Sequence, residues 1–207
     1  MFTSAAPQYI NFISSPEVRR SLCSSAASGG GSSTAKSLSQ AFKFRNTATA
    51  LIMSSHPDLL CMNMMCEKVG GPCACRLALA LSRMPLLRRV DISRNSFNVL
   101  PDSLTELSDL QHLDLSCKLI ANELYYVFEA DCLRADNGLK DFPTTLASCP
   151  KLSHLDLSYN SITEMGAESL RAFPALSHLD LRGNPLSSSS RTALAAASLP
   201  QHLAVLL

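Results

Sequence analysis

A recurring pattern of apolar and polar positions runs through the second half of the chain. Four segments carry it: LRRVDISRN from Leu87, LQHLDLS from Leu110, LSHLDLSYN from Leu152 and LSHLDLRGN from Leu176. In each segment two apolar residues flank one polar residue, and this period of two points both apolar side chains to one face of a short strand. Each segment therefore predicts a strand with one buried and one exposed face.

The chain between these strands also supplies apolar residues at intervals. Leu100 and Leu104 follow the first strand, and Leu170 and Phe173 precede the last. One such unit cannot bury its own apolar face, so the units must stack on one another to form a core.

Three of the segments end in asparagine, at Asn95, Asn160 and Asn184. A buried amide without hydrogen-bond partners is costly. We therefore expect these side chains to point inward and to hydrogen-bond the backbone of neighbouring units.

The consensus L-x-x-L-x-L-x-x-N resembles that of the leucine-rich repeat superfamily. A weaker match, LLCMNMMCE from Leu59, places Met62 and Met64 at leucine positions in the core of a first strand. The resemblance implies an α/β solenoid arc with a parallel β-sheet on its concave side, and a scaffold that binds proteins without catalysis. On this basis residues 58–207 are the repeat domain, and residues 1–57 are a disordered, flexible tail.

The resemblance also implies details of the return segments and of the C-terminus. Residues 69–87 and 165–176 resemble ribonuclease-inhibitor-like repeats, whose return segment is a true helix, whereas the proline-bearing segments resemble short repeats with an irregular or 3₁₀ return. Residues 187–207 form a C-terminal cap, with a helix N-capped by Ser189 or Ser190.

The repeat period breaks once. Equivalent strand residues are 23 positions apart from Val90 to Leu113 and 24 apart from Leu155 to Leu179, but 42 apart from Leu113 to Leu155. One repeat therefore holds 19 extra residues, near 117–135. A loop insertion on the rim of the solenoid is one explanation, and its apolar residues would then form a partner-binding helix.

An in-frame retained intron is the other explanation, and the one that we favour. Cys117-Lys118 can be encoded by TGTAAG, which contains a splice donor, and Ala135-Asp136 by GCAGAT, which contains an acceptor. Joining the two sites yields a tyrosine codon and restores LDLSYNGL, the same LDLSYN as in the next repeat.

Charge is distributed unevenly along the chain. The formal net charge is +1, yet residues 1–56 carry +4 and the remainder −3. This balance excludes a nucleic-acid-binding coat, and no apolar run approaches the roughly 20 residues of a membrane span. The N-terminal segment is poor in acids and rich in serine, alanine and arginine, which is typical of a mitochondrial transit peptide. An ordinary tail on a cytoplasmic protein is the alternative.

The chain contains eight cysteines, too few for a disulfide scaffold. Without a secretory signal we expect free thiols. Cys61, Cys66, Cys73 and Cys75 are weak candidates for a metal site, because their spacing matches no common zinc knuckle. We expect no metal and no other cofactor, and a thiol-based metal-binding protein is the least favoured reading.

The polar strand positions form columns on the exposed face of the sheet, since neighbouring strands lie about 4.8 Å apart. The first column holds Arg89, His112, His154 and His178, the second Asp91, Asp114, Asp156 and Asp180, and the third Ser93, Ser116, Ser158 and Arg182. Serine, histidine and aspartate on every strand are a repeat consensus rather than one catalytic triad, so we expect no enzyme activity.

Stacked aspartates repel one another, and a basic side chain from a partner would relieve this repulsion. We therefore expect the concave face to bind a basic or mixed-charge segment of a protein partner, with protonated histidines already offsetting part of the charge. The candidate binding residues are Arg89, Asp91, His112, Asp114, His154, Asp156, His178, Asp180 and Arg182. The alternative is that these columns only satisfy the repeat, and that the contacts lie on a rim or in the tail.

Two cellular contexts fit such a scaffold. The chain is a monomer or a subunit of a larger complex, and that complex is organellar if the tail is a transit peptide. The alternative is a cytosolic regulatory subunit of a phosphatase or a signalling enzyme.

Overall fold

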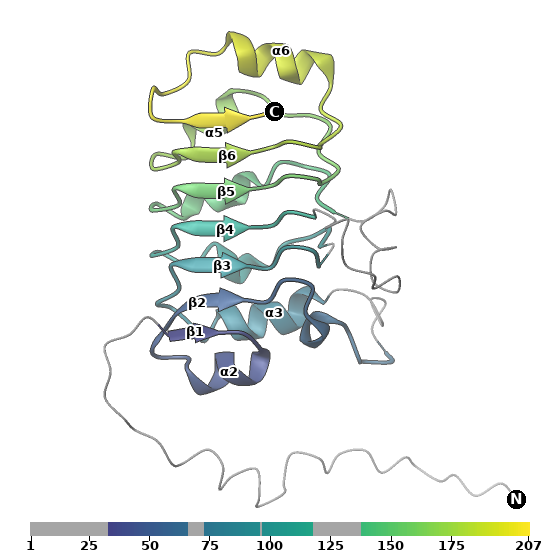
Figure 1. Ribbon diagram of the computed structural model, residues 1–207, viewed down its shortest axis with the longest axis vertical. Helices are drawn as coiled ribbons and strands as arrows, with labels where there is room; N and C mark the ends of the chain where they lie inside the picture. Colours follow the sequence, from purple (N-terminus) through teal and green to yellow (C-terminus); the bar gives the residue numbers. More distant parts are fainter. Residues whose placement is uncertain (1–32, 66–72, 96, 118–137) are drawn as a thin grey trace, which may run out of the picture. The chain divides into compact units, whose positions relative to one another are not determined.

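The computed structural model describes residues 33–65, 73–95, 97–117 and 138–207. They belong to one compact unit. Its centre is a seven-stranded sheet in which the strands follow chain order and each pairs in parallel with the next (Figure 1). The strands are β1 (Ser33–Ala35), β2 (Ala48–Ile52), β3 (Arg89–Asp91), β4 (His112–Asp114), β5 (His154–Asp156), β6 (His178–Asp180) and β7 (Ala204–Leu206).

Short helices lie in the segments that return the chain from one strand to the next. They are α2 (Leu38–Lys43), η1 (Pro57–Leu59), α3 (Ala74–Leu81), η2 (Asp102–Leu104), η3 (Thr144–Ser148), α5 (Glu168–Arg171) and α6 (Ser188–Ala196). The expected helical returns are thus α3 and the single turn α5, and the proline-bearing returns are 3₁₀ as expected. Among these helices none is long and apolar enough to cross a bilayer.

The predicted apolar face of the strands is confirmed. The middle residues of consecutive strands pair with one another, and Leu51, Val90, Leu113, Leu155 and Leu179 are all at most 2% exposed. The return segments close the core from the other side, where Leu104, Leu170, Phe173 and Leu176 are buried. Stacking of the units therefore buries what a single unit would expose.

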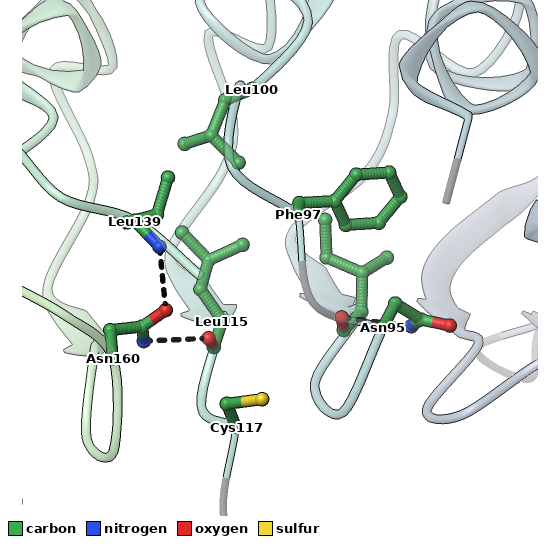
Figure 2. A pocket seen from close by; sticks show the side chains of 8 residues that line it. Asn95, Phe97, Leu100, Leu115, Cys117, Leu139 and Asn160 are labelled. Carbon is green, nitrogen blue, oxygen red and sulfur yellow. Dashed lines mark hydrogen bonds between the residues drawn. The ribbon is translucent and has the colours of Figure 1, made fainter. Parts of the chain in front are cut away.

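The inward orientation of the asparagines is also confirmed. The Nδ2 of Asn160 donates to the carbonyl of Leu115 at 3.0 Å (Figure 2). It also donates to the carbonyl of Leu157 at 2.9 Å. Its Oδ1 accepts from the N–H of Leu139 at 3.1 Å. Equivalent contacts recur at Asn184 with Leu157, Leu181 and Ile162. The Nδ2 of Asn95 likewise donates to the carbonyls of Met53 and Ile92, whereas its Oδ1 accepts from the N–H of His56, which stands at the ladder position of the preceding repeat. We call these three side chains the asparagine ladder.

The sheet begins before the predicted domain boundary at residue 58. Strands β1 and β2 belong to the same sheet as the later strands, and Leu51 of β2 pairs with Val90 of β3. Their sequence departs from the consensus, because Ala48 and Met53 replace leucines and His56 stands at the ladder position. Residues 33–57 are therefore part of the repeat fold. Residues 1–32 lie outside the described structure.

The weak match from Leu59 is wrong, because no strand forms there. Met62, Met64 and the adjacent Met65 are 78%, 84% and 91% exposed rather than in the core. The unit that precedes β3 is formed by β2 instead, and Leu59 belongs to its return segment.

The C-terminal cap forms as expected, but with a different N-cap. Ser187 rather than Ser189 or Ser190 caps α6, because its Oγ accepts from the N–H of Ser190 at 3.1 Å. Strand β7 pairs with β6, and Val205 packs against the core. The cap therefore covers the last repeat.

Candidate interaction surface

The strand register aligns the predicted columns. Arg89, His112, His154 and His178 pair in sequence across β3 to β6, and so do Asp91, Asp114, Asp156 and Asp180. All described members of the two columns are therefore neighbours on one side of the sheet. We call them the histidine column, which includes Arg89, and the aspartate column.

Each aspartate also has a structural role that the sequence reasoning missed. The Oδ1 of Asp114 accepts from the N–H of Ser116 at 3.0 Å, and that of Asp156 from the N–H of Ser158 at 2.9 Å. The same contact to the residue two positions later recurs at Asp91 and Asp180. These Asx turns end the strands. One oxygen of every aspartate is thus committed to the backbone.

Asp180 is closed to a partner, which corrects its place among the candidate binding residues. Its side chain is buried, and the residue is 3% exposed. The guanidinium of Arg182 forms a fork on the carboxylate, with Nε–Oδ1 at 3.0 Å and Nη2–Oδ2 at 2.6 Å. Burial raises the pKa of Asp180, but these hydrogen bonds and the charge of Arg182 outweigh it, so the pKa lies below the ordinary value.

Asp114 lies in the opposite electrostatic environment. Burial raises the pKa of its carboxyl, and the neighbouring charges of Asp156 and Asp91 raise it further. Hydrogen bonds from Ser116 offset only part of this effect. The middle of the aspartate column therefore carries repulsion that no basic side chain of the described structure relieves as Arg182 does at Asp180.

The histidine column is a stack of imidazole rings. The ring centroids of His112 and His154 are 4.2 Å apart at an interplanar angle of 28°, and those of His154 and His178 are 5.8 Å apart at 29°. Burial lowers the pKa of His112, and the charges of His154 and Arg89 lower it further. Protonation of His112 is therefore disfavoured, which makes this imidazole a poor counter-ion for Asp114.

The serine column does not face solvent. Ser93, Ser116 and Ser158 are all buried, and only Arg182 at the end of this column is exposed. A different serine, Ser153, lies with its Oγ 2.9 Å from Nδ1 of His154, but it also contacts the carbonyl of Gln111 at 3.1 Å. None of the described aspartates in the column accepts a hydrogen bond from a histidine, so these residues assemble no Ser–His–Asp relay.

The columns continue onto strands that the sequence analysis did not include. Ala50 and Ile52 of β2 pair with Arg89 and Asp91, and Ala204 and Leu206 of β7 pair with His178 and Asp180. The polar surface is thus bordered by small or apolar residues at both ends. The deviating repeat sequence around β2 concealed this border.

A shallow hollow lies over the middle of the two columns. It has an empty volume of about 410 Å³ and is lined by Arg89, Val90, His112, Leu113, Asp114, His154, Leu155, Asp156 and His178. The walls combine imidazole rings with carboxylate oxygens. This chemistry suits a cationic side chain.

Three of the four cysteine candidates lie in the described part of the chain. Cys61, Cys73 and Cys75 are not disulfide-bonded, and Cys66 lies outside the described residues. Within the described part of the chain, no three histidine, cysteine, aspartate or glutamate side chains are grouped to hold a metal. The expectation of free thiols fails at Cys117, which is disulfide-bonded.

The leucine-rich repeat family model matches residues 135–186. These residues contain β5 and β6 and two members of the asparagine ladder. The chain has the leucine-rich repeat fold. Its short strands, one in each repeat, are the concave sheet of that fold.

Solved structures of other leucine-rich repeat proteins resemble it. A leucine-rich repeat protein of Leptospira interrogans has a TM-score of 0.50 and 16% identity, over 81% of this chain and 33% of that chain. The Toll–Spätzle complex of Drosophila, described as a molecular hub in development and innate immunity, has a TM-score of 0.49 and 14% identity, over 86% of this chain and 19% of that chain. The chain thus spans a third or less of the length of those chains, and the likeness concerns the fold alone. No curated protein matches its sequence.

Proposed function

We propose that this leucine-rich repeat protein is a non-catalytic interaction module that binds a basic segment of a partner protein on the concave sheet. The observation that carries the proposal is the unrelieved charge at the middle of the aspartate column. Asp114 has a raised pKa because it is partly buried beside other carboxylates. A guanidinium from a partner would do there what Arg182 does at Asp180.

The surroundings of the column define the partner further. The stacked rings of His112 and His154 lie on the same strands and on the same side of the sheet as the carboxylates of Asp114 and Asp156. Apolar residues at Ile52 and at β7 border the polar surface. We therefore expect an extended segment that crosses the strands, with arginine at its centre and apolar side chains on either side.

The test is selection from a random peptide library displayed on phage, with the purified full chain as bait. We expect the selected peptides to be enriched in arginine at a central position. In the double variant Asp114→Lys and Asp156→Lys, two column charges are reversed. We expect it to lose those peptides by at least about tenfold in affinity, since like charges face one another across the contact.

A matched control reverses two exposed charges on the return segment after β3, in the double variant Asp102→Lys and Glu106→Lys. It changes the net charge equally, so it separates a local contact from general attraction. We expect it to bind the selected peptides as the unaltered chain does. Equal binding by the column variant would refute the proposal, and so would equal loss in the control.

We also propose that the protein acts inside an organelle, with residues 1–32 as part of an import signal. The support is the composition of residues 1–32, which carry two basic residues against one acidic residue and are rich in serine and alanine. Mass spectrometry of the protein from fractionated cells tests this. A mature N-terminus near Ser21–Ser33 in the mitochondrial fraction is expected. A chain that begins at Met1 in the cytosol with enzyme subunits bound would instead support the regulatory-subunit alternative.

A further inference from the structure

The repeat that contains the 19 extra residues leaves the regular fold at a definite position. The N–H of Cys117 donates to the carbonyl of Ser158 at 3.1 Å. In the next repeat the N–H of Tyr159 donates to the carbonyl of Arg182 at 2.8 Å. Tyr159 comes directly before the ladder residue Asn160. Cys117 therefore holds the position directly before a ladder residue.

The chain re-enters the regular fold at an equally definite position. The N–H of Leu139 donates to Oδ1 of Asn160, as the N–H of Ile162 donates to Oδ1 of Asn184. Ile162 comes two residues after Asn160, so Leu139 is two residues after its own ladder position. That position in the sequence is Asn137.

The positions at which the chain leaves and re-enters the regular fold match each other to the residue. Residues 118–136 number 19, which is the whole excess of this repeat, and joining position 117 to Asn137 adds or loses nothing. An ordinary rim loop carries no requirement that its removal restore both flanking contacts and the ladder asparagine. We infer that the protein also exists in a short form that lacks residues 118–136, has tyrosine at position 117 and completes its asparagine ladder with Asn137.

The backbone on both sides of the junction supports this inference. The residues directly before ladder positions have left-handed conformations, with φ of 47° at Ser55, 60° at Arg94, 58° at Tyr159 and 74° at Gly183. Cys117 is described and does not share this conformation, whereas Gly138 has φ of 105°. The residue equivalent to Gly138 in the next repeat is Ser161, which has no positive φ. The full chain thus departs from the repeat geometry at both ends of the extra segment.

A small, partly enclosed cavity lies at the junction, and its described lining includes Asn95, Leu115, Cys117, Leu139 and Asn160 (Figure 2). The cavity lies between the ladder residues Asn95 and Asn160. In the short form the amide of Asn137 would lie between the carbonyls of Ile92 and Leu115, as that of Asn184 lies between Leu157 and Leu181.

The first test is tryptic mass spectrometry of the protein from its own cells. Trypsin cuts the full chain after Arg94, Lys118, Arg134 and Lys140. The short form yields one peptide that starts at Asn95 and ends in LDLSYNGLK, and the full chain yields the peptide 119–134. Detection of the LDLSYNGLK peptide is the expected result. Peptide 119–134 without any LDLSYNGLK peptide, together with a transcript population that lacks the junction, would overturn the inference.

The second test compares the two forms as recombinant proteins. Gly138→Ser introduces the residue that Ser161 supplies in the next repeat. In the full chain the serine would have to adopt the φ of 105° that Gly138 has, and its Cβ would lie 3.2 Å from Oδ1 of Asn160. We expect Gly138→Ser to lower the melting temperature of the full chain by about 2–4 °C or more and to leave the short form unchanged.

Asn137→Ala is the converse variant. It removes the ladder amide only where a continuous ladder exists, so we expect it to lower the melting temperature of the short form by about 2–4 °C or more. In the full chain we expect a smaller change. A short form that fails to unfold cooperatively, or that responds to both variants as the full chain does, would refute the completed ladder.

Discussion

The asparagine ladder and the aspartate column both repeat along the chain, but the asparagines bond within the core and the aspartates lie on the exposed side of the sheet. Each places one polar side chain per repeat, at the end of a strand or four positions after it. Asn160 spends both its donor and its acceptor on backbone groups within the core. Asp156 spends one oxygen on the N–H of Ser158 and stays partly exposed. Side chains whose hydrogen-bond donors and acceptors are all used by the backbone hold neighbouring repeats together. Side chains that use only one carboxylate oxygen in this way retain capacity for a ligand.

A second contrast lies within the aspartate column. Asp114 and Asp180 occupy equivalent positions, but the residue two places later is Ser116 in one case and Arg182 in the other. Arg182 lowers the pKa of Asp180 against the effect of burial, whereas burial and neighbouring carboxylates raise the pKa of Asp114. The last repeat therefore supplies its own cation, and the middle repeats do not.

The largest expected effect tests the contrast between the asparagine ladder and the aspartate column. Asn160→Ala leaves the N–H of Leu139 without its acceptor and removes two donated bonds in the core. We expect a loss of about 3 kcal/mol in the free energy of unfolding, measured by urea denaturation. Asp156→Ala, in the exposed column, is the matched comparison, and we expect it to cost about 1 kcal/mol or less. Equal losses for the two variants would contradict the division between core ladder and exposed column.

An intermediate effect is expected at Arg182. Arg182→Ala leaves the buried carboxylate of Asp180 without its fork, but the arginine side chain is itself largely exposed. Solvent screening reduces the value of the pair, so at neutral pH we expect a smaller loss of stability than Asn160→Ala causes. Urea denaturation of Arg182→Ala and of Arg182→Lys measures it. A lysine that restored the full stability would show that charge alone, rather than the planar fork, holds Asp180.

The smallest expected effect is on the stability of two isosteric variants, Asp180→Asn and Asp114→Asn, which should change in opposite directions. Asp180 is ionised below its ordinary pKa of 3.8, so its stabilising effect is present above that pH and is lost as the pH falls through its lowered folded pKa. Asp114 retains its proton above 3.8, so stability falls as the pH rises from 3.8 through its raised folded pKa. At pH 7 we therefore expect Asp180→Asn to destabilise the protein and Asp114→Asn to stabilise it.

Thermal unfolding of both variants between pH 3 and pH 7 tests this expectation. The difference between each variant and the unaltered chain should shrink toward acid pH, where the carboxyls are protonated in either state. Shifts of the same sign at pH 7 would show that the residue two positions after the aspartate does not decide its electrostatics.

Predictions from the sequence succeeded at repeat positions where only one kind of side chain meets the physical requirement. The period of two identified the buried strand leucines such as Leu155, and buried amides had no solvent alternative, so the ladder followed from Asn95, Asn160 and Asn184. Prediction failed where a position tolerates several residues. Strand β2 was missed because alanine, methionine and His56 replace its consensus residues, although the same backbone contacts form.

The sequence by itself determined the repeat fold, the alignment of the two columns and the length of the extra segment, because each depends only on spacing along the chain. Only the tertiary structure decided which members of the aspartate column remain accessible to a partner. Asp180 is closed by Arg182, and Asp114 is left beside like charges, because burial and charge at a site depend on neighbours from other repeats. The same holds at the junction, where contacts of Cys117 and Leu139 to later repeats locate the exit and re-entry of the chain.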